Sequence, residues 1–367
     1  MNNSFAAANI PCRIYIPDWC GNYEKPYCAP PVYPFLDDHQ YQEDWFEKYG
    51  DYVNKVKIVE TIADCDAVLL MYELGYYYKK KKLDVLKTMN EDAIRHHKPF
   101  VCWVKGDPGI TPQLRSFHLY RQGGYKSKNR GNQFSVPVFI KDPLPDFFNG
   151  QISIKTTKPD KPLIGFCGQG KAGLGKVAAD IARGLKTRID KLLGKYPFDV
   201  EAWYSSTYMR SMMLDRLEKS DLVDTRFIRH TKYRAGSTSE IEKKETSKIF
   251  FKNMGEADYI ICYRGAGNFS VRLFETMASG KIPVIITSNN NLPLEDKIEW
   301  NIFPVIPENK WKCIDKRVAA FHGKLSTDDF ISLQYQSRQL WQNYLSYKGF
   351  FSHWPDRYMP KNQTATS

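Results

Sequence analysis

Apolar residues along the chain follow two spacings. Short apolar runs alternate with longer segments in which apolar residues recur every three or four positions. The first spacing is typical of buried strands and the second of amphipathic helices, so their alternation predicts an α/β fold. In the first half, strands are predicted at 12–17, 67–71, 99–104 and 136–140, and helices at 44–56 and 83–96. In the second half, strands are predicted at 163–167, 199–204, 225–229, 259–262, 283–286 and 303–306, and helices at 177–193 and 327–347.

Two domains follow from the polar, proline-bearing segment 150–162, which is typical of a linker. We predict an N-terminal domain at 1–155, a C-terminal domain at 156–345 and a C-terminal segment at 346–367 whose tail from residue 360 is disordered. In open α/β sheets, ligands bind beyond the carboxyl ends of the strands. Catalytic and ligand-binding residues are therefore expected at those ends.

Composition narrows the class of protein. The chain has 367 residues, a net charge of +12 and eight cysteines without a C-x-x-C pair, which gives zinc and redox motifs no support. It also lacks a signal peptide and an apolar run of about 18 residues, so we predict a soluble, cytoplasmic protein without a transmembrane segment. No nucleic-acid-binding signature accompanies the basic charge. We assign that charge to a solvated surface and to attraction of an anionic substrate, and predict no nucleic-acid partner. The oligomeric state has no signal in the sequence.

One glycine-rich stretch, GFCGQGKAGLGKVAAD at 165–180, is nearly a P-loop. Gly170 and Gly175-Lys176 have the spacing G-x-x-x-x-G-K, but Val177 stands where a P-loop needs a hydroxyl for Mg²⁺. Glycines between a strand and a helix can instead admit an anion to the helix N-terminus. A glycine-rich turn without any ligand is the alternative.

The segment 259–300 carries the richest constellation. A predicted strand ends just before Arg264, a glycine loop through Gly265 and Asn268 follows, and a helix begins near Ser270. Free backbone N–H groups, the positive charge of Arg264 and Arg272 and a capping serine together favour a diphosphate. Glu275, one turn into the helix, can accept both hydroxyls of a ribose. The alternative is that Arg272 and Glu275 form only a surface ion pair.

This segment resembles the donor-binding region of exostosin-type glycosyltransferases (family 47). The resemblance rests on about forty residues with this pattern: Arg264-Gly265, Ser270-x-Arg272-x-x-Glu275, Ala278-x-Gly280-x-Ile282-Pro283-Val284, Leu292-Pro293 and Ile298-x-Trp300. Looser similarity extends from the strand at residue 163 to residue 347. One departure is Tyr263, where the family usually has proline.

The resemblance implies a GT-B fold, in which two Rossmann-like domains face a central cleft. It also implies an inverting transfer of a sugar from a UDP-sugar to a glycan acceptor hydroxyl, with no cofactor and no bound metal. Gly168, Gly170 and Lys171 would line the diphosphate, and Arg226 would contact the donor. Many family members carry a membrane anchor that is absent here. The soluble members encoded by algal viruses (chloroviruses) fit better, which makes xylose the first candidate sugar and the host cytoplasm the expected location.

The transfer needs a base for the acceptor hydroxyl and positive charge for the leaving UDP. Arg264 is assigned the second role. For the base, Glu73 follows a predicted strand and is the first candidate, Asp38 is the second and Asp107 the third. Two histidines, His39 and His118, are further options.

Two other patterns each have a functional and a simpler structural interpretation. Asp64-Cys65-Asp66 matches the D-x-D of metal-dependent transferases, but it precedes a strand instead of following one, so we predict no metal site. The three tyrosines at 76–78 could stack on an acceptor sugar or pack between the domains.

Two other functions remain open. The chain could be a catalytically inactive glycan-binding protein of the same fold, or a P-loop NTPase or kinase. The sequence identifies neither the sugar nor the acceptor.

Overall fold

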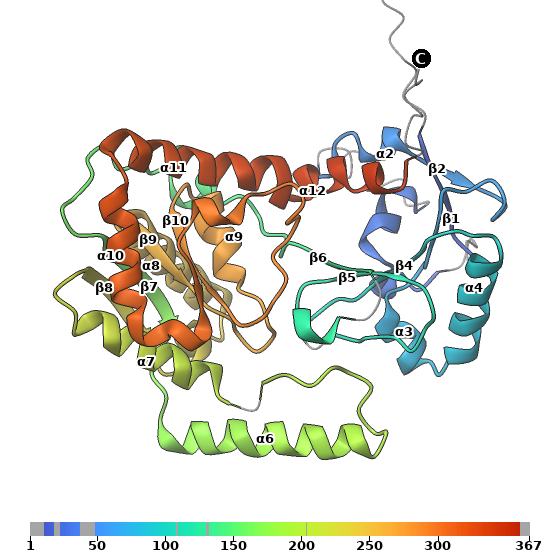
Figure 1. The fold of residues 1–367 in the computed structure, drawn as a ribbon, viewed down its shortest axis with the longest axis horizontal. Coiled ribbons are helices and arrows are strands. Elements are labelled where there is room, and N and C mark those ends of the chain that lie inside the picture. Colours follow the sequence, from blue (N-terminus) through green and yellow to red (C-terminus); the bar gives the residue numbers. More distant parts are fainter. Residues whose placement is uncertain are drawn as a thin grey trace, which may run out of the picture.

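The computed structural model describes residues 11–17, 23–36, 48–107, 109–129, 132–202 and 204–359. Within these ranges the chain forms two parallel sheets, each flanked by helices (Figure 1). No helix in the described part of the chain is long and apolar enough to cross a membrane.

The N-terminal sheet has six parallel strands in the order β2-β1-β3-β4-β5-β6. Its strands are β1 (Cys12–Tyr15), β2 (Val56–Val59), β3 (Ala67–Leu69), β4 (Phe100–Trp103), β5 (His118–Arg121) and β6 (Asn132–Ser135). β3 and β4 are buried along their whole length. This burial on both faces is why these strands are continuously apolar instead of alternating.

The C-terminal sheet has five parallel strands in the order β11-β10-β9-β7-β8. Its strands are β7 (Leu163–Gln169), β8 (Asp224–His230), β9 (Tyr259–Cys262), β10 (Ile282–Thr287) and β11 (Val305–Pro307). In each sheet, the first strand along the chain lies next to the edge strand. The second strand pairs with it on the edge side, and the later strands follow on its other side. This doubly wound order confirms the predicted pair of Rossmann-like domains. It places topological switch points between β1 and β3 and between β7 and β9.

Helices fill the connections and cover the sheets (Figure 1). Those of the N-terminal half are α2 (Tyr52–Lys55), α3 (Leu74–Lys79), α4 (Leu83–Arg95) and α5 (Pro143–Phe147). Those of the C-terminal half are α6 (Leu174–Leu192), α7 (Ser206–Glu218), α8 (Glu240–Glu256), α9 (Val271–Ala278), α10 (Ile314–Lys324), α11 (Thr327–Leu340) and α12 (Tyr347–His353).

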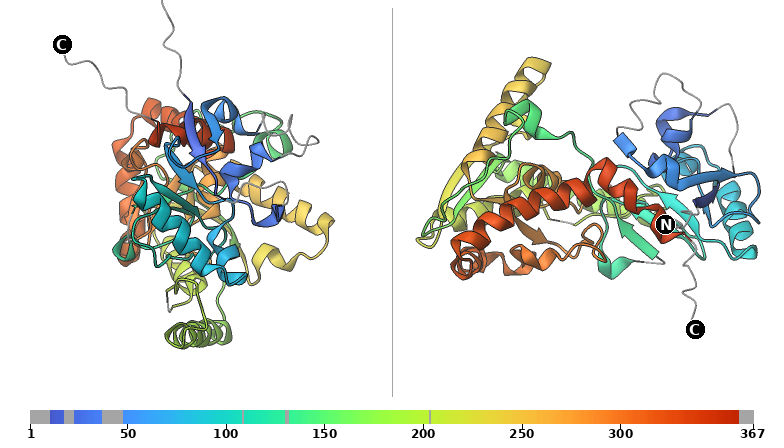
Figure 2. Two further views of the ribbon diagram at one scale, coloured as in Figure 1. Left: turned by 90° about the vertical axis from the view of Figure 1, so that its right-hand side faces the viewer. Right: turned by 90° about the horizontal axis from the view of Figure 1, so that it is seen from above.

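The end of the chain returns to the first domain. α11 runs along the C-terminal domain and α12 continues it onto the N-terminal one (Figure 2, right). Phe350, Phe351, Trp354 and Tyr358 are buried in the same hydrophobic core as β1, β3 and β4. The segment from residue 346 to 359 is thus part of the N-terminal core, whereas the predicted disordered tail from residue 360 lies outside the described residues.

The linker region packs against the C-terminal domain. Asp142 receives two hydrogen bonds from Arg338 of α11, at 2.9 and 2.6 Å. Further on, the backbone N–H of Lys155 donates to the side chain of Gln334 at 2.9 Å. The predicted linker at 150–162 contains no helix or strand.

Three predicted elements differ from the structure. The predicted strand at 199–204 is wrong, because residues 199–202 form an irregular segment that contacts the other domain. The strand expected at 136–140 lies earlier, as β6, and of the helix expected at 44–56 the described part is short and ends at Lys55. β2 and β5 were not predicted: each has only four residues, and Lys57 in β2 and His118 and Arg121 in β5 leave no continuous apolar run.

Gly165 provides a test of packing in the C-terminal sheet. A Cβ atom at this position would lie 2.6 Å from the Cβ of Ala257 and 2.8 Å from Ile260 Cδ1. We expect Gly165→Ala to lower the free energy of unfolding by about 1–3 kcal/mol, because the core must shift to admit the methyl group. Denaturant-induced unfolding measures this change.

Gly323 in α10 is the matched control. No heavy atom lies within 4 Å of a Cβ built there. Gly323→Ala should leave stability unchanged or raise it by up to about 1 kcal/mol through helix propensity. Equal effects of the two substitutions would contradict the packing argument.

Candidate functional site

The switch point of the C-terminal sheet is held by a buried arginine. Arg210, on α7, donates to the backbone carbonyl of Gln169 at 2.7 Å and to that of Arg264 at 2.6 Å. These carbonyls lie at the carboxyl ends of β7 and β9. Burial lowers the pKa of Arg210 to about 10, and the charge of Arg272 acts in the same direction. Arg210 therefore remains a cation at neutral pH and places fixed positive charge between the two strands.

Arg272 and Gly168, two residues of the predicted donor site, lie in direct contact. Arg272 Nη2 donates to the Cys167 carbonyl at 2.8 Å, and its guanidinium lies 4.3 Å from the centre of the Phe166 ring. A Cβ at Gly168 would lie 2.8 Å from that same nitrogen, and the residue has a φ of +147°. A glycine is required here because the arginine packs directly against the backbone.

Gly170 and Lys171 have a different role from the predicted one. Their backbone N–H groups both donate to the carbonyl of His230, at 3.1 and 3.3 Å, so these amides are already used by the protein. A Cβ at Gly170 would lie 2.9 Å from Leu214 Cδ1. Packing thus explains Gly170. The side chain of Lys171 is exposed and remains the group through which this turn could meet an anion.

Arg264 lies at the centre of a buried network instead of facing an open site. It is 4% exposed, and Nη2 donates to the carboxylate of Glu201 and to the carbonyl of Ala266. Nη1 donates to the hydroxyl of Tyr125 at 2.6 Å and to Asn268 at 3.2 Å. Tyr125 in turn donates to Glu201 at 2.9 Å. The guanidinium predicted to stabilise a leaving group is already balanced by a carboxylate.

The side chain of Asn268 is fully used within the protein. Its amide nitrogen donates to the carbonyls of Gly124 and Ser288, at 2.8 and 3.0 Å. Its oxygen accepts from Arg264 and from the hydroxyl of Ser288. Since an amide has two donor and two acceptor positions, this asparagine has no hydrogen-bonding capacity left for a ligand. It joins the loop after β9 to the N-terminal domain.

The remaining residues of this constellation surround the start of α9. Ser270 is the N-cap of the helix and makes no side-chain capping hydrogen bond, and Gly265 is exposed at the surface of the loop. Glu275 is partly buried one turn into the helix. Ser270 and Arg264 line a cavity of about 20 Å³, which is large enough for about one water molecule.

Arg226 does not lie with the other predicted donor-binding residues. It is the third residue of β8 and forms an ion pair with Glu256, the last residue of α8. Both are near the amino ends of the strands, whereas Arg264 follows the carboxyl end of β9. The position of Arg226 along its strand directs it away from the predicted site.

In the N-terminal domain, Glu73 follows the carboxyl end of β3, beside the switch point between β1 and β3. Its carboxylate accepts the backbone N–H of Lys105 at 3.0 Å. Burial raises the pKa of Glu73, against the opposing effect of the Lys105 N–H and charge. A carboxylate with a raised pKa at such a strand end is a reasonable general base.

The other candidate bases are less well placed. Asp38 and His39 lie outside the described residues. His118 is at the amino end of β5, contacts the Tyr358 hydroxyl at 3.1 Å, and has a pKa lowered by burial. Asp107 has an exposed side chain, and its backbone carbonyl would lie 3.0 Å from a Cβ at Gly267. The loop after β4 is therefore close to the loop after β9.

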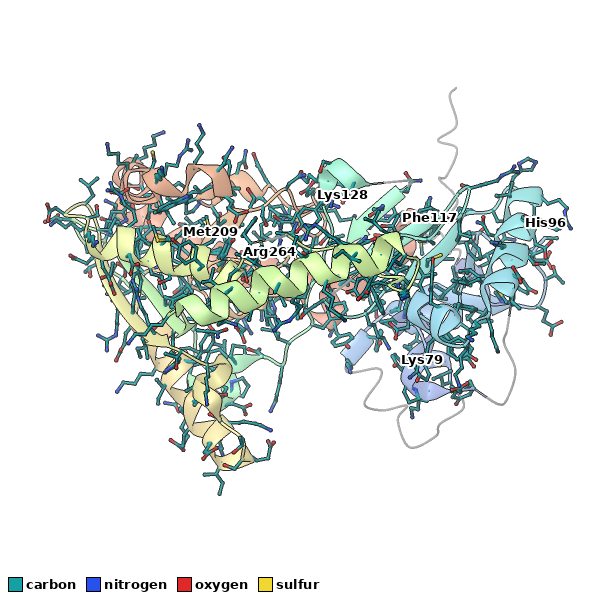
Figure 3. All side chains as sticks on the ribbon, turned by 90° about the horizontal axis from the view of Figure 1, so that it is seen from below. Lys79, His96, Phe117, Lys128, Met209 and Arg264 are labelled. Carbon is teal, nitrogen blue, oxygen red and sulfur yellow. The ribbon has the colours of Figure 1, made fainter. Side chains whose placement is uncertain are left out.

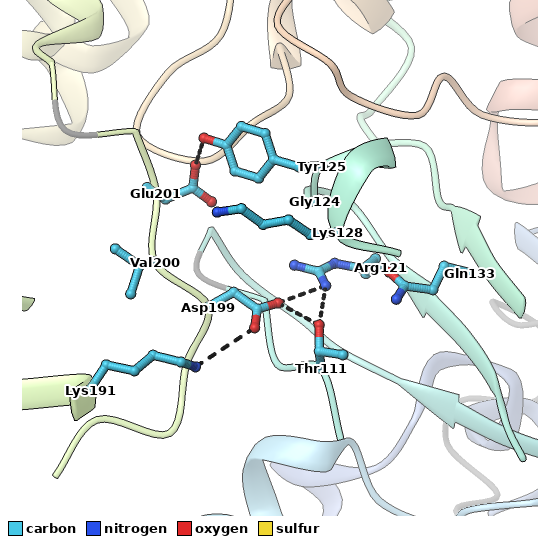
Figure 4. Close-up of a pocket in the computed structure, with 10 residues that line it drawn as sticks. All are labelled: Thr111, Arg121, Gly124, Tyr125, Lys128, Gln133, Lys191, Asp199, Val200 and Glu201. Atoms are coloured by element: carbon cyan, nitrogen blue, oxygen red, sulfur yellow. Dashed lines mark hydrogen bonds and ion pairs between the residues drawn. The ribbon is translucent and has the colours of Figure 1, made fainter. Parts of the chain in front are cut away.

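A cavity of about 210 Å³ lies between the two domains, next to the Arg264 network (Figure 4). On one side, Arg121 donates to Asp199 at 2.8 Å and to Thr111 at 3.2 Å; on another, Glu201 bonds to Tyr125. The residues that line it are Thr111, Arg121, Gly124, Tyr125, Lys128, Gln133, Lys191, Asp199, Val200 and Glu201. Such mixed hydrogen-bonding groups beside an aromatic ring suit the hydroxyls and the apolar face of a sugar.

None of these lining residues was predicted. Asp199 and Glu201 fell in a segment interpreted as a strand, and their partners lie 63 to 88 positions away along the chain. The alternation of acidic and apolar residues at 199–202 was the signal that could have been read differently.

The D-x-D pattern at 64–66 and the tyrosines at 76–78 have structural explanations. Asp66 pairs with Arg13 at 2.7 Å and Asp64 accepts from Thr61 at 2.7 Å. Among the residues that the structure describes, no three His, Cys, Asp or Glu side chains are grouped as metal ligands. Tyr76 stacks on Tyr72 at 4.1 Å between ring centres and is buried, which favours packing over acceptor binding.

No protein-family model and no curated protein matches the chain. The solved structures to which the chain has low similarity include the following three. The pneumococcal O-GlcNAc transferase GtfA, in complex with UDP and GlcNAc, has 12% identity and a TM-score of 0.33, over 80% of this chain and 56% of its own. TarM has 10% identity and a TM-score of 0.34, over 80% and 56%. A glycosyltransferase from Rickettsia africae ESF-5 has 10% identity and a TM-score of 0.34, over 95% and 98%. This chain thus spans little more than half the length of the first two, and similarity at this level carries no argument about its activity.

The Arg264 network gives a stability prediction. Glu201→Ala should lower the free energy of unfolding by about 3 kcal/mol, because it leaves a buried guanidinium without its carboxylate. Glu245→Ala is the control, since Glu245 pairs with Lys248 at 2.7 Å where both side chains are more than half exposed. Its removal should cost less than about 1 kcal/mol. If both variants unfold at the same denaturant concentration, Arg264 does not depend on Glu201.

Proposed function

We propose that the protein is a glycosyltransferase that binds a UDP-sugar at the switch point between β7 and β9. The observation that carries the proposal is the convergence of three arginines, Arg210, Arg264 and Arg272, on the carboxyl ends of these two strands. Concentrated guanidinium charge beside a helix N-terminus favours a diphosphate. Glu275, on the same helix, is proposed to accept the ribose hydroxyls.

Donor binding must then compete with Glu201. In the described structure, Glu201 is the carboxylate that balances Arg264. A diphosphate can replace it as the anionic partner, which would release Glu201 and the segment 199–202 toward the cavity between the domains. This exchange gives Arg264 the predicted role of stabilising the leaving UDP.

The cavity beside Arg264 is proposed to hold the acceptor sugar. Glu73 does not line this cavity, so the acceptor must extend from it toward the end of β3, where Glu73 takes the proton of the acceptor hydroxyl in the transfer. The acceptor oxygen bonds to the anomeric carbon while the bond from that carbon to the phosphate oxygen breaks, with inversion. The arginines hold the negative charge that develops on UDP. We propose that no metal is required and that xylose is the first sugar to test.

Donor binding can be tested by thermal shift with UDP-xylose, UDP-galactose, UDP-glucose, UDP-glucuronate, GDP-sugars and ATP, each with Mg²⁺ or EDTA. One UDP-sugar should raise the melting temperature in EDTA. Glu275→Ala should weaken its binding by about 10- to 100-fold, through the loss of charge-assisted hydrogen bonds. Glu245→Ala, on exposed α8, is the control. Stabilisation by ATP and Mg²⁺ alone would favour the P-loop alternative instead.

Catalysis can be tested separately through Glu73. Glu73→Gln should keep UDP-sugar binding and lower kcat by about 10²- to 10⁴-fold, because the amide cannot take a proton. The base must be deprotonated, and its pKa is raised above the ordinary 4.5. Wild-type activity should therefore fall as the pH decreases through a value above 4.5, and the variant should lack this step.

The control for Glu73 is Glu91→Gln, at an exposed position of α4. It should leave kcat and its pH profile unchanged. A Glu73→Gln enzyme with normal kcat would exclude this residue as the base. UDP binding without turnover of any acceptor in the wild type would favour an inactive glycan-binding protein.

A further inference from the structure

Helix α6 stands apart from the body of the protein. It follows β7, runs below both domains, and is joined to the rest of the fold by the segments at its two ends (Figures 1 and 3). Among its side chains that the structure describes, none is buried. The crossover between β7 and β8 is completed by α7, so the sheet does not need α6 for its connection.

The polar side of α6 is the one that faces the protein. Asp180 accepts the hydroxyl of Ser205 at 2.6 Å, and Arg188 Nη2 donates to the backbone carbonyl of Glu201 at 3.1 Å. Lys191 donates to the carbonyl of Phe198 at 2.6 Å. These contacts hold the helix to the segment that returns along it.

Val177 and Ile181, near the start of α6, are partly buried, but the apolar side of its C-terminal half is turned outward. Leu185, Ile189, Leu192 and Leu193 are 55%, 56%, 87% and 61% exposed. Their spacing places them on one stripe of the helix. An amphipathic helix on a globular protein normally buries such a stripe against the core. Here the orientation is reversed, and a contiguous row of large aliphatic side chains is left for another surface.

The charges around this apolar stripe indicate which kind of partner surface α6 would contact. α6 contains five basic and two acidic residues, and the whole chain has a net charge of +12. Arg183 and Lys186 have side chains that are 75% and 79% exposed, and they pair with Asp180 and Asp190 at 3.5 and 3.4 Å. Exposed pairs of this kind are weak, so the two basic side chains can also contact acidic headgroups. The exposed Lys79, at the end of α3, is also visible on this side of the molecule (Figure 3). A second copy of the chain would bring the same positive charge to the contact, which disfavours self-association through α6.

We propose that α6 is an interfacial helix that docks the protein on an anionic lipid bilayer. Its leucines and isoleucine would enter the boundary between headgroups and acyl chains, while its arginines and lysines contact acidic headgroups. Only four residues separate the end of β7 from the start of α6, so docking would hold the proposed donor site near the membrane. An acceptor attached to a lipid would then be within reach, a last step that rests on the proposed function.

Vesicle co-sedimentation tests the docking without any need for activity. The full chain should bind vesicles of equimolar phosphatidylcholine and phosphatidylglycerol, more weakly at high salt, and bind pure phosphatidylcholine poorly. The triple variant Leu185→Ser, Ile189→Ser, Leu192→Ser should lower the partition coefficient by more than about tenfold. Because these side chains are exposed, its circular dichroism and melting temperature should stay those of the wild type.

Two further variants sharpen the test. Ile241→Ser with Ile249→Ser removes aliphatic groups that are 78% and 46% exposed on α8, and should bind vesicles as the wild type does. Lys186→Glu with Lys195→Glu should weaken binding by several-fold per charge at low salt and little at high salt. The proposal is overturned if the wild type does not bind anionic vesicles, or if the triple variant binds as well. A dimer in sedimentation velocity that requires the same three side chains, without vesicle binding, would also overturn it.

Discussion

A buried guanidinium must have a counter-charge, and the way in which Arg264 meets this requirement organises the structure. Arg264 follows the carboxyl end of β9, and its side-chain partners come from three parts of the chain. They are Tyr125 of the N-terminal domain, Glu201 of the segment after α6, and Asn268 of the same loop as Arg264. Removing a charge from water without a partner costs several kcal/mol. The two domains and the α6 segment are therefore held together at one point.

This arrangement couples the proposed donor site to the space between the domains. Arg210 and Arg272 donate hydrogen bonds to backbone carbonyls at the ends of the strands. Arg264 instead has a carboxylate that an incoming diphosphate can replace. Because Glu201 also lines the cavity of about 210 Å³, the proposed donor binding at the strand ends would also rearrange the cavity. Occupation of the donor site would in this way prepare the surface that meets an acceptor.

The same segment explains the unusual orientation of α6. Asp199 and Glu201 are held by Arg121 and Arg264, and the backbone near them accepts hydrogen bonds from Arg188 and Lys191. The polar face of the helix is therefore fixed toward the protein by electrostatics and hydrogen bonds. With the polar face inside, the leucines and isoleucine have no position except the outer surface. One set of ionic contacts thus determines both the cavity wall and the exposed apolar stripe.

The sequence by itself determined the features that depend on local spacing. Apolar runs identified β3, β4, β7 and β9, and the glycine loop followed by helical spacing placed the start of α9 close to Ser270. Tertiary structure decided how the polar groups at those strand ends are used. Gly170 is required by contact with Leu214, Asn268 is saturated by Gly124 and Ser288, and Arg226 pairs with Glu256. These partners are remote in the chain, so no local pattern reveals them. The periodicity of α6 likewise predicted an amphipathic helix, but only the folded chain decided which of its faces is turned to the solvent.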